Sequence, residues 1–297
     1  MVYSSTEELA AAALTFARTG LEADEEVVVC LSGDGNRLVA AELAGDAARF
    51  VDPLGRDTNP ARAMAQLLVI AASTDRQVRY VGDLGWTNVP WGQASVAAEA
   101  VLADALLDTL GGAGRPMNLF CGIPSELAEV PGVLACHDGL RAAVGWQPNA
   151  GYDAGTAAAL FALPLPEPGA PVSVYCSNGR PLAALREFVA EHARAAHVSQ
   201  ARADDLVLAA HEVATNSLRH AGSEPIVRMW RDAAAGSVVC EIHDHGLIAD
   251  PMAGRLLPET EREDGRGLWL ANQLCDLAQV RSSALDGTTV RLHVRAA

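Results

Sequence analysis

A run of prolines divides this chain into two parts. Four of the nine residues from Leu163 to Pro171 are proline, and a proline inside a helix removes a hydrogen bond and clashes with the preceding turn. The segment therefore favours an extended spacer. A chain of 297 residues is long enough for about two domains. We expect a first domain over residues 1–162, a linker over 163–171 and a second domain over 172–297.

The two parts differ in charge. Residues 1–171 hold 21 acidic residues and nine arginines, a net charge of −12, whereas residues 172–297 hold 16 and 13, a net charge of −3. The total of −15 argues against nucleic acid as the main partner, because neutralising phosphates requires clustered cations. All 22 basic residues are arginine, which excludes a P-loop lysine, a Schiff base and a lysine general base.

Neither membrane insertion nor secretion is expected. The longest apolar stretches, such as 63–72, have about half of the ~20 residues that a membrane-spanning helix needs. Residues 1–6 contain no basic run before an apolar core, so we expect a cytoplasmic protein. The six cysteines stand singly, without a Cys-x-x-Cys pair, which favours buried reduced thiols over disulfides or zinc binding.

Helix-like and strand-like segments alternate in the first part. The patterns predict helices at 7–18, 36–48, 60–73, 94–110 and 124–130, and strands at 26–31, 78–81 and 117–121. This order predicts an α/β fold with a largely parallel sheet and helices on both faces.

Two glycine-containing segments in this part could form phosphate-binding loops. Residues 111–114 follow a helix and precede a strand, which is the wrong order for such a loop. Residues 32–36 have the right order, but Asp34 would repel a phosphate, and an ordinary turn with a helix N-cap is the alternative.

The order of elements, together with Asn118-Leu-Phe-Cys-Gly-Ile-Pro-Ser125 and Gly132-Val-Leu-Ala-Cys-His-Asp138, resembles the MEDS sensory domain, a degenerate RecA-like module of bacterial regulators. The resemblance spans about residues 5–155. It implies that the domain senses a small-molecule ligand or a partner without catalysing a reaction. His137 either contacts such a ligand or ends a short strand at the surface.

The segment from Asp204 to His220 carries the most chemical information. Its apolar residues recur at helical spacing, and Glu212 and Asn216, four residues apart, lie on the same face with His220 a turn beyond. A side-chain amide oxygen can bind Mg²⁺, and a neighbouring carboxylate can accept a proton from a hydroxyl group. For these two residues alone, an ordinary solvated helix face is the alternative.

Two further segments could contact a nucleotide. The alternating pattern of residues 237–244 predicts a half-buried strand that ends on Asp244-His-Gly246. Its carboxylate can accept a hydrogen bond from an adenine amino group, while the glycine lets the base approach the backbone. Gly265-Arg-Gly267 opens an apolar helix at 268–275, and free N–H groups at a helix start bind anions without lysine.

Taken together, Glu212-Val-Ala-Thr-Asn216, Asp244-His-Gly246, Gly265-Arg-Gly267 and Gly287-Thr-Thr-Val290 resemble the N, G1 and G2 boxes and the terminal strand of the GHKL ATPases. Within that superfamily, residues 172–296 are similar to the anti-sigma factor serine kinases. The resemblance implies a sandwich of helices on an antiparallel or mixed sheet that binds Mg·ATP. It also implies capture of a sigma factor and phosphorylation of a serine on a STAS-domain anti-anti-sigma protein.

The resemblance also assigns roles by position. Glu212 matches the general base, Asn216 the magnesium ligand and Asp244 the acid that recognises adenine. The other residues expected to bind ATP are Gly246, Gly265, Arg266, Gly267, Leu268 and Thr289. His220 stands where the N box often ends in histidine, with a capping or packing role as the alternative. His243 and His245 have a spacing that could bind metal, but no third ligand is in view.

Two features of this sequence depart from the family pattern. Ile248 stands where a second glycine is common, and the expected ATP lid, residues 247–264, is acidic over residues 259–264. Acidic side chains repel a triphosphate unless they face solvent or Mg²⁺. The sequence therefore supports two alternative functions. The first is an anti-sigma serine kinase gated by the first domain. The second is a catalytically weak or inactive binding module that sequesters a sigma factor or a STAS partner. A homodimer is compatible with both.

Overall fold

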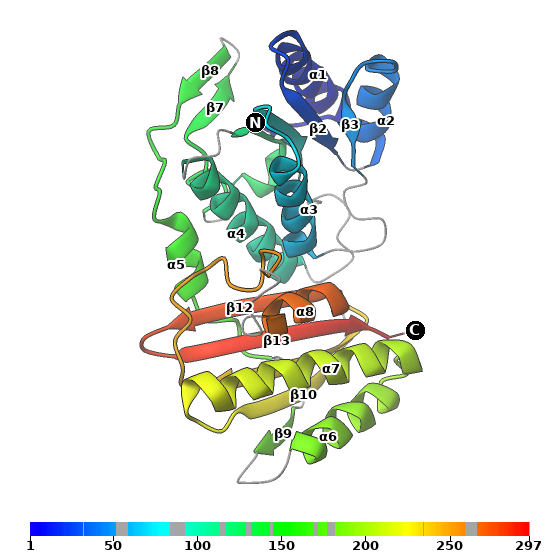
Figure 1. The fold of residues 1–297 in the computed structure, drawn as a ribbon, viewed down its shortest axis with the longest axis vertical. Helices are drawn as coiled ribbons and strands as arrows, with labels where there is room; N and C mark the ends of the chain where they lie inside the picture. Colours follow the sequence, from blue (N-terminus) through cyan, green and yellow to red (C-terminus); the bar gives the residue numbers. More distant parts are fainter. Residues whose placement is uncertain are drawn as a thin grey trace. The chain divides into compact units, whose positions relative to one another are not determined.

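The computed structural model describes residues 1–31, 33–51, 59–83, 93–112, 117–128, 132–142, 145–168, 172–176, 182–233, 235–258 and 266–296. Of these, the residues up to Leu160 form one compact unit and those from Phe161 onward form a second (Figure 1). No helix in the described ranges is long and apolar enough to cross a membrane.

A parallel sheet of four strands, in the order β3-β2-β4-β5, forms the centre of the first unit. The strands are β2 (Glu26–Cys30), β3 (Arg49–Phe50), β4 (Val78–Gly82) and β5 (Met117–Cys121). From Val27 to Val29 the side chains of β2 are all buried, because helices cover both faces of the sheet.

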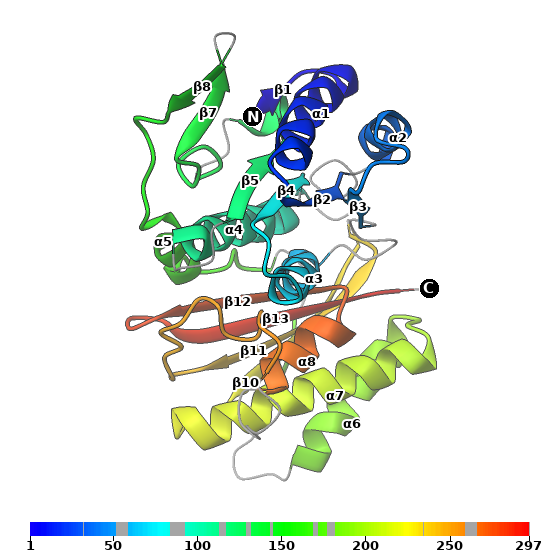
Figure 2. The ribbon, with the colours of Figure 1, turned by 45° about the horizontal axis from the view of Figure 1, so that its top comes forward.

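Four helices cover this sheet, with α1 (Thr6–Glu22) and α2 (Gly33–Glu42) on one face and α3 (Pro60–Ala72) and α4 (Gln93–Gly112) on the other (Figure 2). Local sequence signals start two of them. Ser5 Oγ accepts a hydrogen bond from the Glu8 amide at 3.2 Å and caps α1. Asn59 Oδ1 accepts one from Ala61 at 3.1 Å at the start of α3.

Smaller elements complete the first unit. β1 (Val2–Tyr3) pairs with β6 (Ile123–Pro124) in parallel, and β7 (Gly139–Ala142) pairs with β8 (Gly145–Pro148) in an antiparallel hairpin. The segment predicted as a helix at 124–130 contains a single 3₁₀ turn, η1 (Ser125–Leu127), within its described part, and α5 spans Thr156–Ala162.

The second unit contains an antiparallel sheet of five strands in the order β12-β13-β11-β10-β9. The strands are β9 (Ser173–Cys176), β10 (Ile226–Asp232), β11 (Ser237–Asp244), β12 (Leu277–Ser283) and β13 (Gly287–Arg295). Three helices cover one face of the sheet (Figure 2): α6 (Leu182–Ala195), α7 (Gln200–Asn216) and α8 (Arg266–Leu274). This arrangement confirms the predicted α/β fold class.

The opposite face of this sheet carries a buried polar network. Glu241, 1% exposed, accepts hydrogen bonds from Arg291 Nε and Nη2 at 2.9 and 2.6 Å and from Arg228 Nε at 2.6 Å. Arg291 Nη2 also donates to the Pro166 carbonyl at 2.9 Å, and Arg228 Nη1 donates to Glu167 at 2.8 Å. The middle of the proline-rich segment is therefore held against the sheet.

His293, on the same face of β13, is expected to make the protein less stable in mild acid. Burial, with the positive charge of Arg291, lowers its pKa to about 3, and Nε2 lies 3.1 Å from Gln279 Oε1. Unfolded histidine has a pKa of about 6.5. Because the folded state binds fewer protons than the unfolded state, this contribution to stability is lost as pH falls from about 6.5 towards about 3.

His293→Gln removes that titration. Between pH 6.5 and 4.5 we expect the wild type to lose up to ~1.4 kcal/mol of unfolding free energy per pH unit relative to the variant. Urea unfolding of both proteins at pH 7, 6 and 5 measures the difference. Parallel pH profiles for the two proteins would contradict the prediction.

Candidate functional site

The helix that holds Glu212 and Asn216 forms because small apolar residues recur along one face. Ala209, Ala210 and Val213 are buried against the sheet, and Glu212 and Asn216 are half-buried beside them. At the end of α7 the chain widens into a short π-helix, η2 (Ser217–Ala221), which ends at Gly222 with a φ of 60°. Such π segments occur frequently at functional sites because they displace side chains from the regular helical register.

The first turn of α8 packs directly on α7 at these two residues. A Cβ atom at Gly267 would lie 2.6 Å from Asn216 Nδ2 and 3.4 Å from Glu212 Cβ. Only glycine allows so close an approach without moving the Asn216 side chain. The contact brings the start of α8, where main-chain N–H groups have no partners within the helix, next to Asn216.

The end of β11 is folded into a tight turn around Asp244. The Gly246 amide donates to Asp244 Oδ1 at 2.7 Å, and a Cβ atom at Gly246 would lie 2.7 Å from Ala221 Cβ. Gly287, with a φ of 74°, lies against the Asp244 carbonyl, where a Cβ atom would overlap its oxygen. The carboxylate of Asp244 is therefore fixed by its own main chain.

Hydroxyl groups hold the residues that follow Asp244. Thr288 Oγ1 donates to the Gly246 carbonyl at 2.9 Å and lies 2.8 Å from Ser282 Oγ. Ser282 Oγ in turn accepts a hydrogen bond from the Ile248 amide at 2.9 Å. Strands β12 and β13 thus fix the chain that leaves β11.

These elements enclose a cavity of about 770 Å³. Its floor and walls come from α7, η2, the end of β11, the segment 247–258, the first turn of α8 and the start of β13. The lining residues are Val213, Asn216, Ser217, His220, Ala221, Asp244, Gly246, Leu247, Ile248, Ala249, Asp250, Met252, Ala253, Gly254, Leu256, Leu257, Pro258, Leu268, Thr288 and Val290. A mostly apolar cavity of this size with a few polar groups is typical of small-molecule sites.

The cavity fits an adenine nucleotide with its metal. Asp244 offers an acceptor next to Gly246, which also lines the cavity, and Asn216 offers an amide oxygen for Mg²⁺. The first turn of α8 adds main-chain donors for phosphate oxygens. These three features lie around one cavity although up to 50 residues separate them in the sequence.

The predicted site residues divide into three groups. Asn216, Asp244, Gly246 and Leu268 line the cavity. Glu212 and Gly267 lie beside it, joined by the contact between α7 and α8, and Arg266 is exposed at the start of α8. Gly265 lies outside the described residues, as do residues 259–264 of the expected lid.

Thr289 does not reach the cavity. Its hydroxyl lies 3.1 Å from His243 Nδ1, on the face of the sheet opposite Asp244. Thr288, which pairs with Asp244 across the strands, lines the cavity instead. Side chains alternate between the two faces of a strand, so the pairing of β13 with β11 identifies Thr288 as the threonine on the Asp244 face. The sequence alone does not give that pairing.

Sequence reasoning also missed the apolar wall of the site. Met252, Leu256 and Leu257 line the cavity from the segment after β11, which is the first part of the expected ATP lid. This segment packs on α8 at Gly254, whose carbonyl accepts a hydrogen bond from Asn272 Nδ2 at 3.0 Å. His220 lines the cavity from the π-helical turn.

One family model matches the part of the chain that holds this cavity. Residues 177–294 match the family model of the histidine kinase-like ATPase domain. Among solved structures, the RsbU and RsbW domains of Rv1364c from Mycobacterium tuberculosis align with 42% of this chain and 32% of their own, at 20% identity and a TM-score of 0.32. The chain therefore spans about a third of that relative. A search of curated proteins gave no match. Residues 177–294 of the second unit are thus similar to the histidine kinase-like ATPase domain family.

Proposed function

We propose that the second unit binds Mg·ATP and transfers the terminal phosphoryl group to a serine of a STAS-domain anti-anti-sigma protein. The same unit would bind a sigma factor, and the first unit would regulate it in response to a small molecule. The observation that carries the proposal is the cavity at which Asn216, Asp244 and the first turn of α8 meet. The match of residues 177–294 to the ATPase domain family supports it.

Each residue has a defined part in this proposal. Bound Mg·ATP supplies the transferable phosphoryl group. Asp244 accepts a hydrogen bond from the adenine amino group, Asn216 provides an oxygen ligand to the metal, and Glu212 accepts the proton of the attacking serine hydroxyl. The first-turn amides of α8 neutralise phosphate charge, in a chain that contains no lysine.

The direct test is transfer of label. Incubating the full chain with γ-labelled ATP, Mg²⁺ and purified STAS-domain proteins should label one of them, and serine-to-alanine substitution in that protein should abolish the label. ATP binding without transfer to any STAS protein would favour the second candidate, a binding module. One observation favours that candidate: Glu212 is not among the residues that line the cavity.

Selectivity for adenine gives a prediction at a single residue. Asp244→Asn keeps Oδ1, which accepts the Gly246 amide, but replaces the second oxygen with a donor that cannot accept from the adenine amino group. A hydrogen bond to a charged group contributes about 1.5–3 kcal/mol. We therefore expect the preference for ATP over GTP to fall by about 10–100-fold, as measured by calorimetric titration of both nucleotides.

Asp250→Asn is the matched control for that substitution. Asp250 lines the same cavity, and its carboxylate accepts the Met252 amide at 2.9 Å, which the asparagine oxygen can also do. Its ATP preference should be unchanged. Equal ATP and GTP affinities in both variants, or an unchanged preference in Asp244→Asn, would remove Asp244 from the adenine site.

A further inference from the structure

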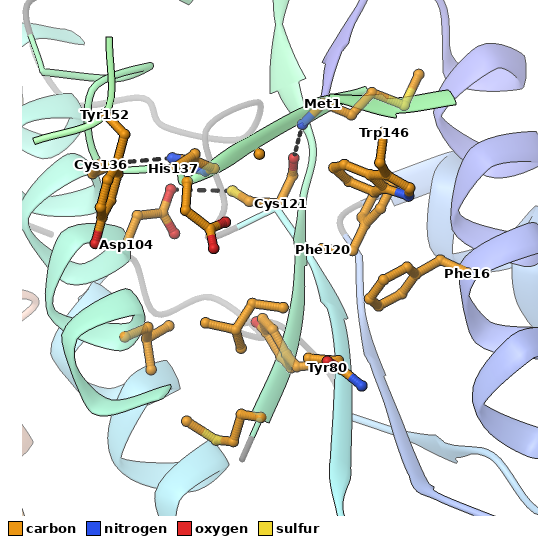
Figure 3. A pocket seen from close by; sticks show the side chains of 16 residues that line it. Met1, Phe16, Tyr80, Asp104, Phe120, Cys121, Cys136, His137, Trp146 and Tyr152 are labelled. Atoms are coloured by element: carbon orange, nitrogen blue, oxygen red, sulfur yellow. Dashed lines mark hydrogen bonds between the residues drawn. The ribbon is translucent and has the colours of Figure 1, made fainter. Parts of the chain in front are cut away.

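The first unit contains a cavity of about 510 Å³ alongside β5, the edge strand of its parallel sheet. The rings of Phe16, Phe120 and Trp146 meet on one side, with centroids 5.6–6.3 Å apart. Figure 3 shows polar and sulfur-containing side chains grouped on the other side. The cavity thus joins an aromatic surface to a cluster of potential ligand atoms.

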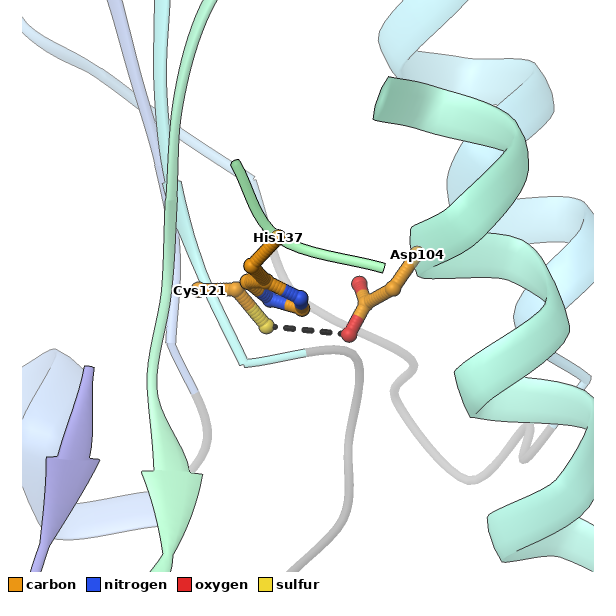
Figure 4. Close-up of side chains that lie close together, drawn as sticks. All are labelled: Asp104, Cys121 and His137. Carbon is orange, nitrogen blue, oxygen red and sulfur yellow. Dashed lines mark hydrogen bonds between the residues drawn. The ribbon is translucent and has the colours of Figure 1, made fainter. Parts of the chain in front are cut away.

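Three residues from separate parts of the fold form that cluster. Asp104 projects from α4, Cys121 is the last residue of β5, and His137 lies in the segment before β7. One ligand atom from each lies within 4.8 Å of the other two (Figure 4). No other group of three such side chains meets this spacing in the described part of the chain.

We propose that Asp104, Cys121 and His137 bind a zinc ion through a carboxylate oxygen, a thiolate and an imidazole nitrogen. These are the three kinds of ligand that zinc takes from proteins, and a thiolate disfavours magnesium, calcium and manganese. Bond lengths of 2.0–2.3 Å around a tetrahedral ion place ligand atoms about 3.3–3.8 Å apart. The Cys121 sulfur lies 3.1 Å from Asp104 Oδ2, so binding requires only small side-chain adjustments.

The surroundings of the cluster favour a bound cation. Asp104 is only 7% exposed, and a buried carboxylate is costly unless it is paired or coordinates a metal. His137 Nδ1 lies 2.9 Å from Cys136 Sγ, a contact that fixes the orientation of the imidazole ring. Outer contacts of this kind commonly orient histidine ligands.

The same cluster lacks the features of a nucleophilic cysteine. The Cys121 thiol is part-buried and donates its hydrogen bond to Asp104, whereas an activated thiol is paired with a base such as histidine. A protonated thiol is a weak nucleophile. Metal binding instead replaces the thiol proton with the ion.

Three protein ligands leave the fourth position of a tetrahedral zinc ion available. All three residues line the cavity, so a donor atom of a small molecule bound in the cavity could take that position. A small molecule with one oxygen, nitrogen or sulfur donor could bind the ion through that atom, and its apolar body could contact the aromatic side chains that line the cavity. This assignment stands independently of the nucleotide site in the second unit.

Cobalt and zinc titrations of the full chain test the site. With the reduced protein and no other ligand, we expect one equivalent of Co²⁺ to give thiolate-to-cobalt charge-transfer absorption, which one equivalent of Zn²⁺ then removes. Imidazole added to the cobalt form should shift its spectrum by occupying the fourth position. If the wild type shows no charge-transfer absorption, the proposal is overturned. If imidazole leaves the cobalt spectrum unchanged, the fourth coordination position is not open.

Substitutions identify the ligands. Cys121→Ser should abolish the charge-transfer absorption, and Asp104→Asn and His137→Gln should each weaken zinc binding by more than about 100-fold, since even outer contacts contribute 10–100-fold. Cys30→Ser, at the end of β2, and Asp138→Asn, next to His137, are matched controls that should bind like the wild type. Loss of binding in a control as large as in the three variants would refute the assignment.

Discussion

Glu212→Gln is expected to slow phosphoryl transfer to the STAS serine by about 10²–10⁴-fold while changing the affinity for Mg·ATP by only a few-fold. A general base lowers the barrier by accepting a proton as the new bond forms, and it contributes little to binding of the ground state. Glutamine has the same shape as glutamate but cannot accept that proton. Single-turnover transfer and calorimetric ATP binding, measured on the same preparations, separate the two quantities.

Asp204→Asn provides the control for this substitution. Asp204 is an exposed acid near the start of the same helix, and its carboxylate accepts a hydrogen bond from Gln200 at 2.8 Å. Its removal should leave both quantities unchanged. If Glu212→Gln transfers phosphate at the wild-type rate, Glu212 is not the base. If neither protein transfers phosphate although both bind ATP, the binding-module function is the correct one.

The regular elements and the nucleotide motifs could be predicted from the sequence because each depends on local patterns. The stretch 117–121 and the strand 237–244 have the expected bounds, since uninterrupted or alternating apolar residues specify them locally. The pairing of β13 with β11, and with it the choice between Thr288 and Thr289, depends on register. Register is set by tertiary contacts that no single segment contains.

The cluster of Asp104, Cys121 and His137 illustrates the same limit. Their separations of 17 and 16 residues match no metal-binding motif, and the isolated cysteines pointed to buried thiols. The ligands come together only because α4 packs beside β5 and the segment after η1 returns to the same edge of the sheet. The sequence singles out His137 as a ligand candidate, but it gives no sign of Asp104 and Cys121 as its partners.

Asn216→Ala and Gly267→Ala are expected to cause the same defect by different routes. The first removes the amide that would hold Mg²⁺, so Mg·ATP affinity should fall at least about tenfold and transfer should be lost, because the metal would neutralise phosphate charge during transfer. The second keeps Asn216 but places a methyl group 2.6 Å from its Nδ2 atom. That contact lies at the end of a short side chain, which can rotate away, so the protein should remain folded.

Gly35→Ala tests whether the effect of Gly267→Ala is specific. Gly35 also lies in the first turn of a helix, but an added Cβ would make only an ordinary contact, 3.4 Å from Leu9 Cδ2. We expect wild-type ATP binding in Gly35→Ala and at least a tenfold loss, about 1.4 kcal/mol, in Gly267→Ala, with similar thermal stability in both. If Gly267→Ala binds Mg·ATP normally, the position of Asn216 does not control nucleotide binding. If Asn216→Ala also binds normally, another group must bind the metal, and the carboxylates nearest the cavity, Asp244 and Asp250, would be the next residues to substitute.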